Sequence, residues 1–259
     1  MVMKVALLHV DVSGGPERRN LELLAESIRL AAEAGAKWIV TPEMAVQGYF
    51  FACEREIKPI VVPIQPSPAV KPLQQLAAEK EITLFLGCAE KDEKTSRYYN
   101  SCLVIGADGR VLGRHRKKHA HSGVSEGWAT KGKHLEPVIC GDIQTGILVC
   151  SDSWYESNAV TLAEKGAEVI IVPAAWPPNS CGGPPENAWK KASAASGRAL
   201  WVCNQTGKQP RLDFSEAQST VITEGEMQMV YSGKPAVLLF EWDFARQCAA
   251  SEAFTVVPL

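Results

Sequence analysis

The chain of 259 residues lacks two features that would set its surroundings. It has no uninterrupted apolar run of the roughly 18 residues that a transmembrane helix needs. It also has no excess of charge of one sign, because 27 Lys and Arg face 29 Asp and Glu for a formal net charge of −2. Such a balance gives no overall bias toward nucleic acid or an acidic membrane surface. We therefore expect neither nucleic acid nor a membrane among the partners.

The cysteines form no Cys-x-x-Cys pair, which removes the usual sequence basis for a zinc knuckle or a thioredoxin-type site. There are eight of them: Cys53, Cys88, Cys102, Cys140, Cys150, Cys181, Cys203 and Cys248. An even count fits a disulfide framework in a small secreted domain, but this chain is large, and its first ten residues predict a core strand rather than a signal peptide. Most of the cysteines lie in apolar runs, where a free thiol packs as a small hydrophobe. We expect free cysteines and a cytoplasmic location.

The sequence also has no internal repeat and no linker long enough to divide it. Hydrophobic residues make up 46% and charged residues 22%, as is usual for a globular protein. Sandwiches and α/β folds often reach about 250 residues as one domain. The Pro-rich stretch 59–72 is short and is expected to be a surface loop. We predict a single domain over residues 1–259.

Apolar residues alternate between helical and strand spacing along the chain. Helices are predicted at 16–34, 71–80, 156–165 and 186–197, and strands at 4–10, 38–41, 82–88, 100–105, 111–115, 146–150, 169–174, 200–204, 219–222, 227–231 and 237–242. Asp108-Gly109 indicates a hairpin turn. Continuous apolar strands such as 169–172 are typical of sheets covered by helices. This α/β pattern fits two sheets with helices outside, and a single mixed sheet as well.

Glu43, Lys117 and Cys150 come at or just after predicted strands. A carboxylate, an ammonium and a thiol provide a base, an oxyanion stabiliser and a nucleophile. The polar turn after Cys150 favours a nucleophile at a strand-to-helix elbow, and a buried core cysteine is the alternative. Glu43 follows an apolar strand, where a buried carboxylate is costly unless it is paired or has a function. The alternative is that it accepts hydrogen bonds from free backbone N–H groups at the start of a helix.

Lys117 belongs to the basic run 110–121, which contains His115, His119 and His121. The run can be a short nucleic-acid patch, a histidine metal site without a carboxylate of its own, or a charged loop with one inward lysine. The residues alone do not show whether Lys117 or Lys118 is the functional lysine. Glu126, in the loop that follows, is by itself equally compatible with a surface carboxylate.

Together these segments resemble the nitrilase, or carbon–nitrogen hydrolase, superfamily over residues 5–207. Pro42-Glu43-Met44 is similar to its glutamate motif, Arg116-Lys117-Lys118-His119 to its lysine motif, and Leu148-Val149-Cys150-Ser151-Asp152 to its cysteine motif. Their order, with steps of 74 and 33 residues, is more specific than any one motif. The lysine motif assigns the role to Lys117. Glu126-Gly127 is similar to an extra loop glutamate found in many members.

The resemblance implies an α-β-β-α four-layer sandwich, with two mixed sheets and helices outside. It implies pairing into a homodimer or higher homo-oligomer, and a mechanism without metal or organic cofactor. In that mechanism Cys150 attacks a carbonyl or nitrile carbon, and Glu43 takes the thiol proton and later activates water. Lys117 and the backbone N–H of Ser151 hold the oxyanion, and Glu126 positions substrate or water. The ammonium nearby is also expected to favour the thiolate of Cys150.

The residues after Cys150 suggest a substrate class. Ser151-Asp152 resembles amidase-type members, whereas the family's true nitrilases tend to have Trp-Glu there. Trp154 stands where many amidase-type members have Arg, so a free carboxylate on the substrate is not expected at that position. The candidate substrate-binding residues, which would line an aromatic and largely apolar pocket, are Tyr49, Trp128, Trp154 and Trp176; the alternative is that two or more are core.

The sequence thus predicts a cysteine-dependent hydrolase of small linear amides, with water as co-substrate. Nitrile hydrolysis is one alternative, and a catalytically idle homologue that binds a ligand or partner is another. Segments 192–198 and 219–225 depart from the pattern of many relatives, which leaves the subfamily and the C-terminal strand pairing open.

Overall fold

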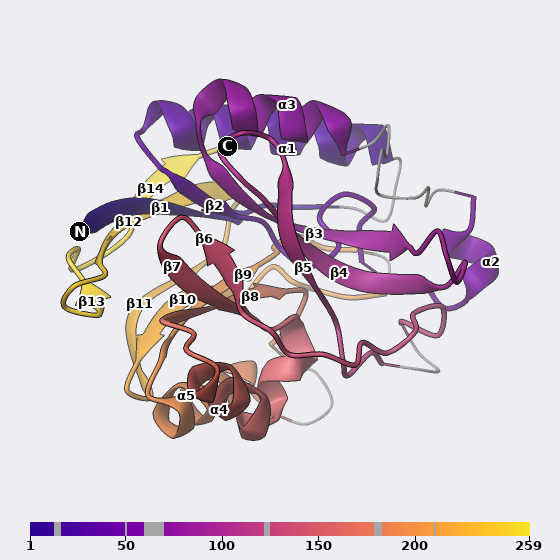
Figure 1. Ribbon diagram of the computed structural model, residues 1–259. Helices are drawn as coiled ribbons and strands as arrows, with labels where there is room; N and C mark the ends of the chain where they lie inside the picture. Colours follow the sequence, from indigo (N-terminus) through magenta and orange to yellow (C-terminus); the bar gives the residue numbers. More distant parts are fainter. Residues whose placement is uncertain (13–16, 50, 60–69, 122–124, 179–182, 210) are drawn as a thin grey trace.

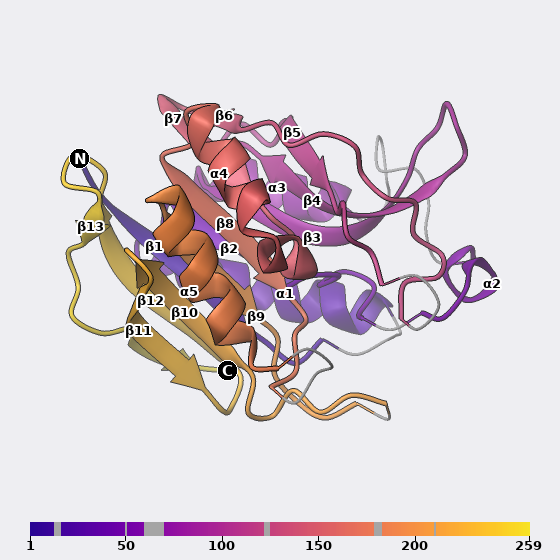
Figure 2. The same cartoon turned by 90° about the horizontal axis from the view of Figure 1, so that it is seen from below.

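Two mixed β-sheets stack face to face and carry helices on their outer faces (Figure 1). The computed structural model describes the chain except for residues 13–16, 50, 60–69, 122–124, 179–182 and 210. Helices α1 and α3 cover one sheet, and α4 and α5 cover the other, as the view from below also shows (Figure 2). This is the α-β-β-α arrangement predicted from the sequence.

The first sheet has the strand order β13-β12-β1-β2-β3-β4-β5, with β14 paired to β12. Its strands are β1 (Val2–His9), β2 (Trp38–Val40), β3 (Thr83–Lys91), β4 (Tyr98–Ile105), β5 (Val111–Arg116), β12 (Ala236–Asp243), β13 (Cys248–Ala249) and β14 (Thr255–Pro258). The helices of this half are α1 (Glu17–Glu33), the short α2 (Glu54–Ile57) and α3 (Lys71–Lys80). No helix in the described ranges is both long and apolar enough to pass through a lipid bilayer.

The second sheet has the order β11-β10-β9-β8-β7-β6. Its strands are β6 (Val138–Cys140), β7 (Ile143–Ile147), β8 (Val169–Ala174), β9 (Ala199–Asn204), β10 (Gln218–Thr223) and β11 (Glu226–Ser232). A 3-10 turn, η1 (Cys150–Trp154), follows β7 and leads into α4 (Glu156–Glu164), while α5 is Pro185–Ser196. Gly197 ends α5 with a positive φ of 63°, as a helix C-cap glycine does.

The three strands predicted at 219–222, 227–231 and 237–242 are divided between the sheets. β10 and β11 form a hairpin in the second sheet, whereas β12 pairs antiparallel with β1 in the first. The reason is that β12 is apolar on both faces. Leu238 and Phe240 pack between the sheets, and Val237 and Leu239 pack in the layer below α1. A strand of this kind is stable only inside a covered sheet.

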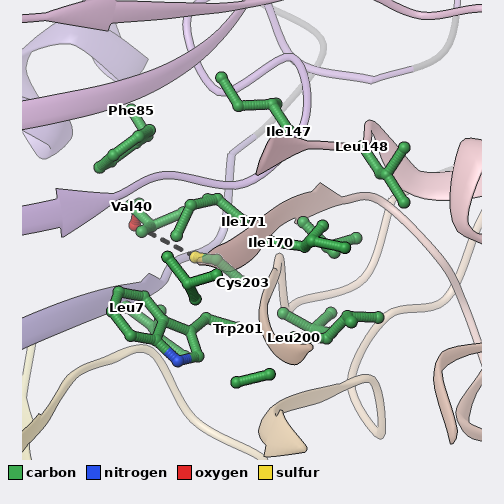
Figure 3. Packing of buried hydrophobic residues seen from close by; sticks show 14 of the residues in the cluster. Leu7, Val40, Phe85, Ile147, Leu148, Ile170, Ile171, Leu200, Trp201 and Cys203 are labelled. Carbon is green, nitrogen blue, oxygen red and sulfur yellow. Dashed lines mark hydrogen bonds between the residues drawn. The ribbon is translucent and has the colours of Figure 1, made fainter. Parts of the chain in front are cut away.

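The space between the sheets is filled by apolar side chains from both (Figure 3). Phe85 comes from the first sheet, and Ile171 and Trp201 come from the second. The Cys203 thiol lies within this layer and donates to the carbonyl oxygen of Val40 across it, at 3.2 Å. The seven cysteines that the structure describes are free, and Cys181 lies outside the described residues.

A glycine in β3 lets the segment after β2 lie directly on the sheet. A Cβ atom at Gly87 would stand 2.0 Å from the carbonyl oxygen of Pro42 and 3.0 Å from the Cα of Glu43. The Gly87 N–H also donates to Thr41 Oγ1 at 2.9 Å. The position of Glu43 therefore depends on a side chain being absent 44 residues later in the sequence.

We expect Gly87→Ala to lower the free energy of unfolding by about 2–3 kcal/mol, since its methyl group must displace backbone. Gly106→Ala is the matched control, because its Cβ would meet the exposed Leu112 side chain at 3.1 Å. The control should lose less than about 1 kcal/mol. Urea unfolding measures both variants, and equal losses would contradict the close approach at Pro42.

Candidate functional site

A buried ammonium lies between two buried carboxylates where the strands of the first sheet end. Lys117 Nζ is 2.7 Å from Glu43 Oε1 and 2.7 Å from Glu126 Oε2. Glu43 follows β2, Lys117 follows β5, and Glu126 comes from the loop after it. All three are at most 1% exposed. The structure thus brings together three of the four residues predicted to be catalytic, including Glu126, whose motif was the weakest.

Asn100 completes this charge cluster, and sequence reasoning missed it. Its side-chain Nδ2 donates to Glu43 Oε1 at 2.6 Å and to Glu126 Oε1 at 2.5 Å. Asn100 lies in β4, where the available signal was a polar amide in a strand of mainly apolar and aromatic residues. Such a group must find a partner when it is buried. Here it joins the two carboxylates, sharing Oε1 of Glu43 with the lysine.

The second sheet also holds Glu43. Its Oε2 accepts the backbone N–H of Ala175 at 3.0 Å, and its own N–H donates to the carbonyl of Ala174 at 3.3 Å. Ala174 ends β8, so this carboxylate bridges the edges of the two sheets. One oxygen faces the lysine and the amide of Asn100, and the other faces a backbone donor. That division fixes the orientation of the carboxylate.

Cys150 was expected to end a strand, but β7 stops at Ile147 and Cys150 begins the 3-10 turn η1. Its φ is +47°, a left-handed conformation that costs energy for a residue with a side chain. Cys150 is 3% exposed, and its thiol and the carboxylate of Glu43 lie close enough to shift each other's pKa. This strained turn places the sulfur beside the carboxylate, as a nucleophile elbow does.

Burial and the neighbouring charges set the ionisation of the charge cluster. Burial raises the pKa of Glu43 to about 7, although the charge of Lys117 opposes this shift. Burial also disfavours the charged forms of the other two. At Lys117 the two neighbouring carboxylates outweigh the effect of burial and raise the pKa of the ammonium well above its ordinary value. At Glu126 the charge of Lys117 outweighs the effect of burial and lowers the pKa of the carboxyl group. Glu43 is therefore the member able to exchange a proton near neutral pH.

Burial, followed by the charge of Glu43, raises the pKa of the Cys150 thiol well above its ordinary value. The ammonium of Lys117 lowers this pKa, as expected, but burial and the charge of Glu43 outweigh its effect. The thiol thus keeps its proton at neutral pH. For the sulfur to act as a nucleophile, a base would have to remove that proton, and the carboxylate of Glu43 lies beside it.

The basic residues next to Lys117 contact other partners than the two carboxylates. Lys118 turns away, with its Nζ 3.4 Å from Asn158 Oδ1. The His115 ring binds Asp152 at 2.7 Å, and the His119 ring stacks on Tyr155 with centroids 3.8 Å apart. Across the residues that the structure describes, no group of three His, Cys, Asp or Glu side chains could hold a metal ion. The basic run is therefore divided between β5 and the segment after it, and Lys117 is the lysine that faces the carboxylates.

The four aromatic candidates fall into two pairs. Tyr49 joins the charge cluster, because its hydroxyl lies 3.3 Å from Glu126 Oε2 and 2.9 Å from Ser125 Oγ, and Trp128 packs in the same apolar group. Trp154 and Trp176 lie against each other with centroids 5.7 Å apart. Trp154 is 41% exposed, whereas Trp176 is buried. Trp176 directly follows the residue whose N–H binds Glu43.

A charged hollow of about 480 Å³ lies on the other face of β5. Successive residues of a strand point to opposite faces, so Arg116 faces this hollow while Lys117 faces the carboxylates. Arg114 and Arg116 both pair there with the buried Glu90. These charges neutralise one another behind the sheet, and the hollow lies away from Cys150.

Lys117→Met should leave Glu43 and Glu126 facing each other without a cation. We expect it to cost about 3–5 kcal/mol of unfolding free energy at alkaline pH. The loss should shrink as the pH falls, because mutual repulsion raises the pKa of the carboxylates in the folded state above their unfolded values, and protonation then relieves it. Lys165→Met, in an exposed pair with Glu136, is the control and should cost less than about 1 kcal/mol. Denaturant unfolding at several pH values tests this, and a pH-independent loss would contradict it.

Comparison with known proteins agrees with this fold. The family model described as carbon-nitrogen hydrolase matches residues 5–232, which extends beyond the resemblance noted to residue 207. A citrullinase of Francisella tularensis is 32% identical over 183 residues, covering 67% of this chain and 61% of the relative. A nitrilase of Pyrococcus abyssi is 28% identical over 173 residues, covering 67% and 65%. The chain thus aligns with less than two thirds of either relative.

A solved structure shares the fold over nearly the whole chain. The carbon-nitrogen hydrolase of Helicobacter pylori superposes with a TM-score of 0.83 at 24% identity, covering 95% of this chain and 91% of that one. The similarity extends from the two stacked sheets to the helices outside them. The chain belongs to the carbon–nitrogen hydrolase family of the nitrilase superfamily.

Proposed function

We propose that this protein hydrolyses the carbon–nitrogen bond of a small linear amide through a thioester on Cys150. One observation carries the proposal: the Cys150 thiol, at a strained turn, lies beside a carboxylate whose pKa is about 7, and that carboxylate contacts a buried ammonium. These groups are a nucleophile, a base near its working pH and a charge stabiliser within contact of one another. A catalytically idle homologue has no need for this costly arrangement of buried charges.

In the first half-reaction the Cys150 sulfur attacks the amide carbon and its proton passes to Glu43. The carbonyl oxygen becomes an oxyanion, which Lys117 Nζ and the backbone N–H of Ser151 stabilise. When the tetrahedral intermediate collapses, the carbon–nitrogen bond breaks and Glu43 gives its proton to the leaving nitrogen. Ammonia or an amine departs, and the acyl group remains on sulfur.

In the second half-reaction Glu43 takes a proton from water, and the resulting hydroxide attacks the thioester carbon. Collapse of this intermediate breaks the carbon–sulfur bond, releases a carboxylic acid and returns the proton to Cys150. Glu126 and Asn100 keep Glu43 and Lys117 in place through these steps. Asn100 donates to the carboxylates of Glu43 and Glu126, and Glu126 accepts from Lys117. Glu126 is also placed to orient substrate or water.

The substrate we propose is uncharged near the scissile bond. The described charges of the site pair with one another, and Trp154 occupies the position of an arginine in many amidase-type members. Trp154 and Trp176 offer an aromatic surface to an apolar acyl group, with Tyr49 and Trp128 beside Glu126. The matched relatives include one named citrullinase and one named nitrilase, so amides and nitriles are the two substrate classes to compare. Ser151-Asp152, which resembles amidase-type members, favours an amide substrate.

The remaining parts of the proposal concern organisation. We propose one hydrolase domain over residues 1–259, acting in the cytoplasm without nucleic acid or membrane partners. Pairing into a homodimer or higher homo-oligomer stays a prediction, and the exposed Trp154 and Tyr155 beside α4 are candidates to become covered.

A panel of neutral amides, charged amides and the corresponding nitriles tests the function. We expect ammonia release to be fastest from neutral amides with apolar acyl groups, and Cys150→Ala to abolish it. Intact mass after substrate incubation should show an acyl adduct on the native protein and none on the variant. Turnover unchanged in Cys150→Ala would contradict the thioester, and faster release from nitriles would reverse the bond preference.

The pH dependence of kcat/KM should report Glu43. Only the ionised carboxylate accepts the thiol proton, so a pKa of about 7 means that the rate falls about tenfold per pH unit below neutrality. Glu43→Gln should remove nearly all activity at every pH while leaving Cys150 in place. A rate that stays constant down to about pH 5 would show that a different group is the base.

A further inference from the structure

We propose that His115 is a positioning residue for this reaction, holding Asp152 so that the Cys150 elbow stays in register with Lys117. The inference rests on the proposed function and extends it to a residue that touches no reacting atom. His115 is 3% exposed and its Nε2 lies 2.7 Å from Asp152 Oδ2, whose side chain is fully buried.

The Asp152 carboxylate accepts donors from both sides of the catalytic lysine. Oδ1 accepts the backbone N–H groups of Lys118 and His119, each at 2.9 Å. Oδ2 accepts the His115 ring and, within its own turn, the N–H of Val149 at 3.2 Å. One carboxylate two residues after the nucleophile therefore fixes the chain before and after Lys117.

The register of β5 explains why His115 is the side chain that reaches Asp152. Residues two apart on a strand face the same side, so His115 points between the sheets as Lys117 does. Its neighbours Arg114 and Arg116 point to the outer hollow. His115 is thus the last inward side chain of β5 before the lysine, and it meets the turn that carries the nucleophile.

A second contact ties the same two segments. The Ser151 hydroxyl donates to the carbonyl of His119 at 2.7 Å. The strained φ of Cys150 needs surroundings that hold it, and these contacts supply them. Burial disfavours the charge of Asp152, but the hydrogen bond from His115 and the donors around it lower its pKa, which keeps the acceptor ionised. Removing the ring would leave a buried carboxylate with one donor fewer, and the two segments would be free to shift.

Matched variants separate the hydrogen bond from the bulk of the ring. His115→Gln places an amide nitrogen where Nε2 stands, while His115→Asn has the same chemistry but falls short of Asp152. His115→Leu removes the donor, and His134→Leu, at an exposed histidine, is the control. The readout is the rate of Cys150 modification, followed by peptide mass, with two reagents. Iodoacetamide carries an amide for the oxyanion donors to orient, and methyl methanethiosulfonate has no carbonyl.

We expect His115→Leu and His115→Asn to slow iodoacetamide by about 100-fold, the cost of a misplacement near 1 Å, and to leave the second reagent within about threefold. His115→Gln and His134→Leu should stay near the native rate. The same order should hold for kcat, with KM little changed. Asp152→Asn should remove most of the further effect of His115→Asn, because coupled residues are not additive. If His115→Leu does not fold, the Gln and Asn variants decide.

Equal rates in the Gln and Asn variants would overturn the positioning role, as would equal slowing with both reagents. The modification rates need no turnover, so they separate this inference from the proposed function. A native protein that releases no ammonia from any amide, yet shows this pattern, would refute the function and leave the role of His115 standing.

Discussion

The site depends on one buried ammonium. Lys117 lies between Glu43 and Glu126 with no exposed surface, and neither carboxylate could remain ionised there without it. Lys117 and Glu126 both lie in the segment after β5, whereas Glu43 comes from a segment 74 residues before Lys117. Their mutual attraction offsets the loss of hydration only when all three are in contact, so the cluster forms completely or not at all. The burial of the cluster also raises the pKa of Glu43 to about 7.

The two sheets provide the geometry that this cluster requires. Glu43 takes one set of contacts from the first sheet and one from the end of β8, and Asp152 connects the turn after β7 to the segment after β5. The apolar layer between the sheets sets their separation (Figure 3). The strained turn at Cys150 and the segment that carries Lys117 then lie on opposite sides of the seam, and Asp152 connects them.

Much of the fold could be predicted because strand and helix periodicity is local. β8 and α3 have the predicted bounds, and most other elements differ by only a few residues. The placement of β12 could not be read this way, since an apolar strand does not state which neighbour it pairs with. Glu43, Lys117 and Cys150 could be selected by order and spacing. Asn100 and His115 could not, because their roles arise from contacts with residues distant in sequence.

The pairing of β1 with β12 has a consequence for biosynthesis. β1 pairs antiparallel with β12, which follows it by more than 220 residues in the sequence. A ribosome releases the chain in order, so β1 waits until β12 has been synthesised before this pairing can form. Such distant pairing slows folding. The first sheet, which positions Glu43 beside Cys150, is consequently complete only after β12 has been synthesised, and a chain that stopped before β12 would hold the two residues less firmly.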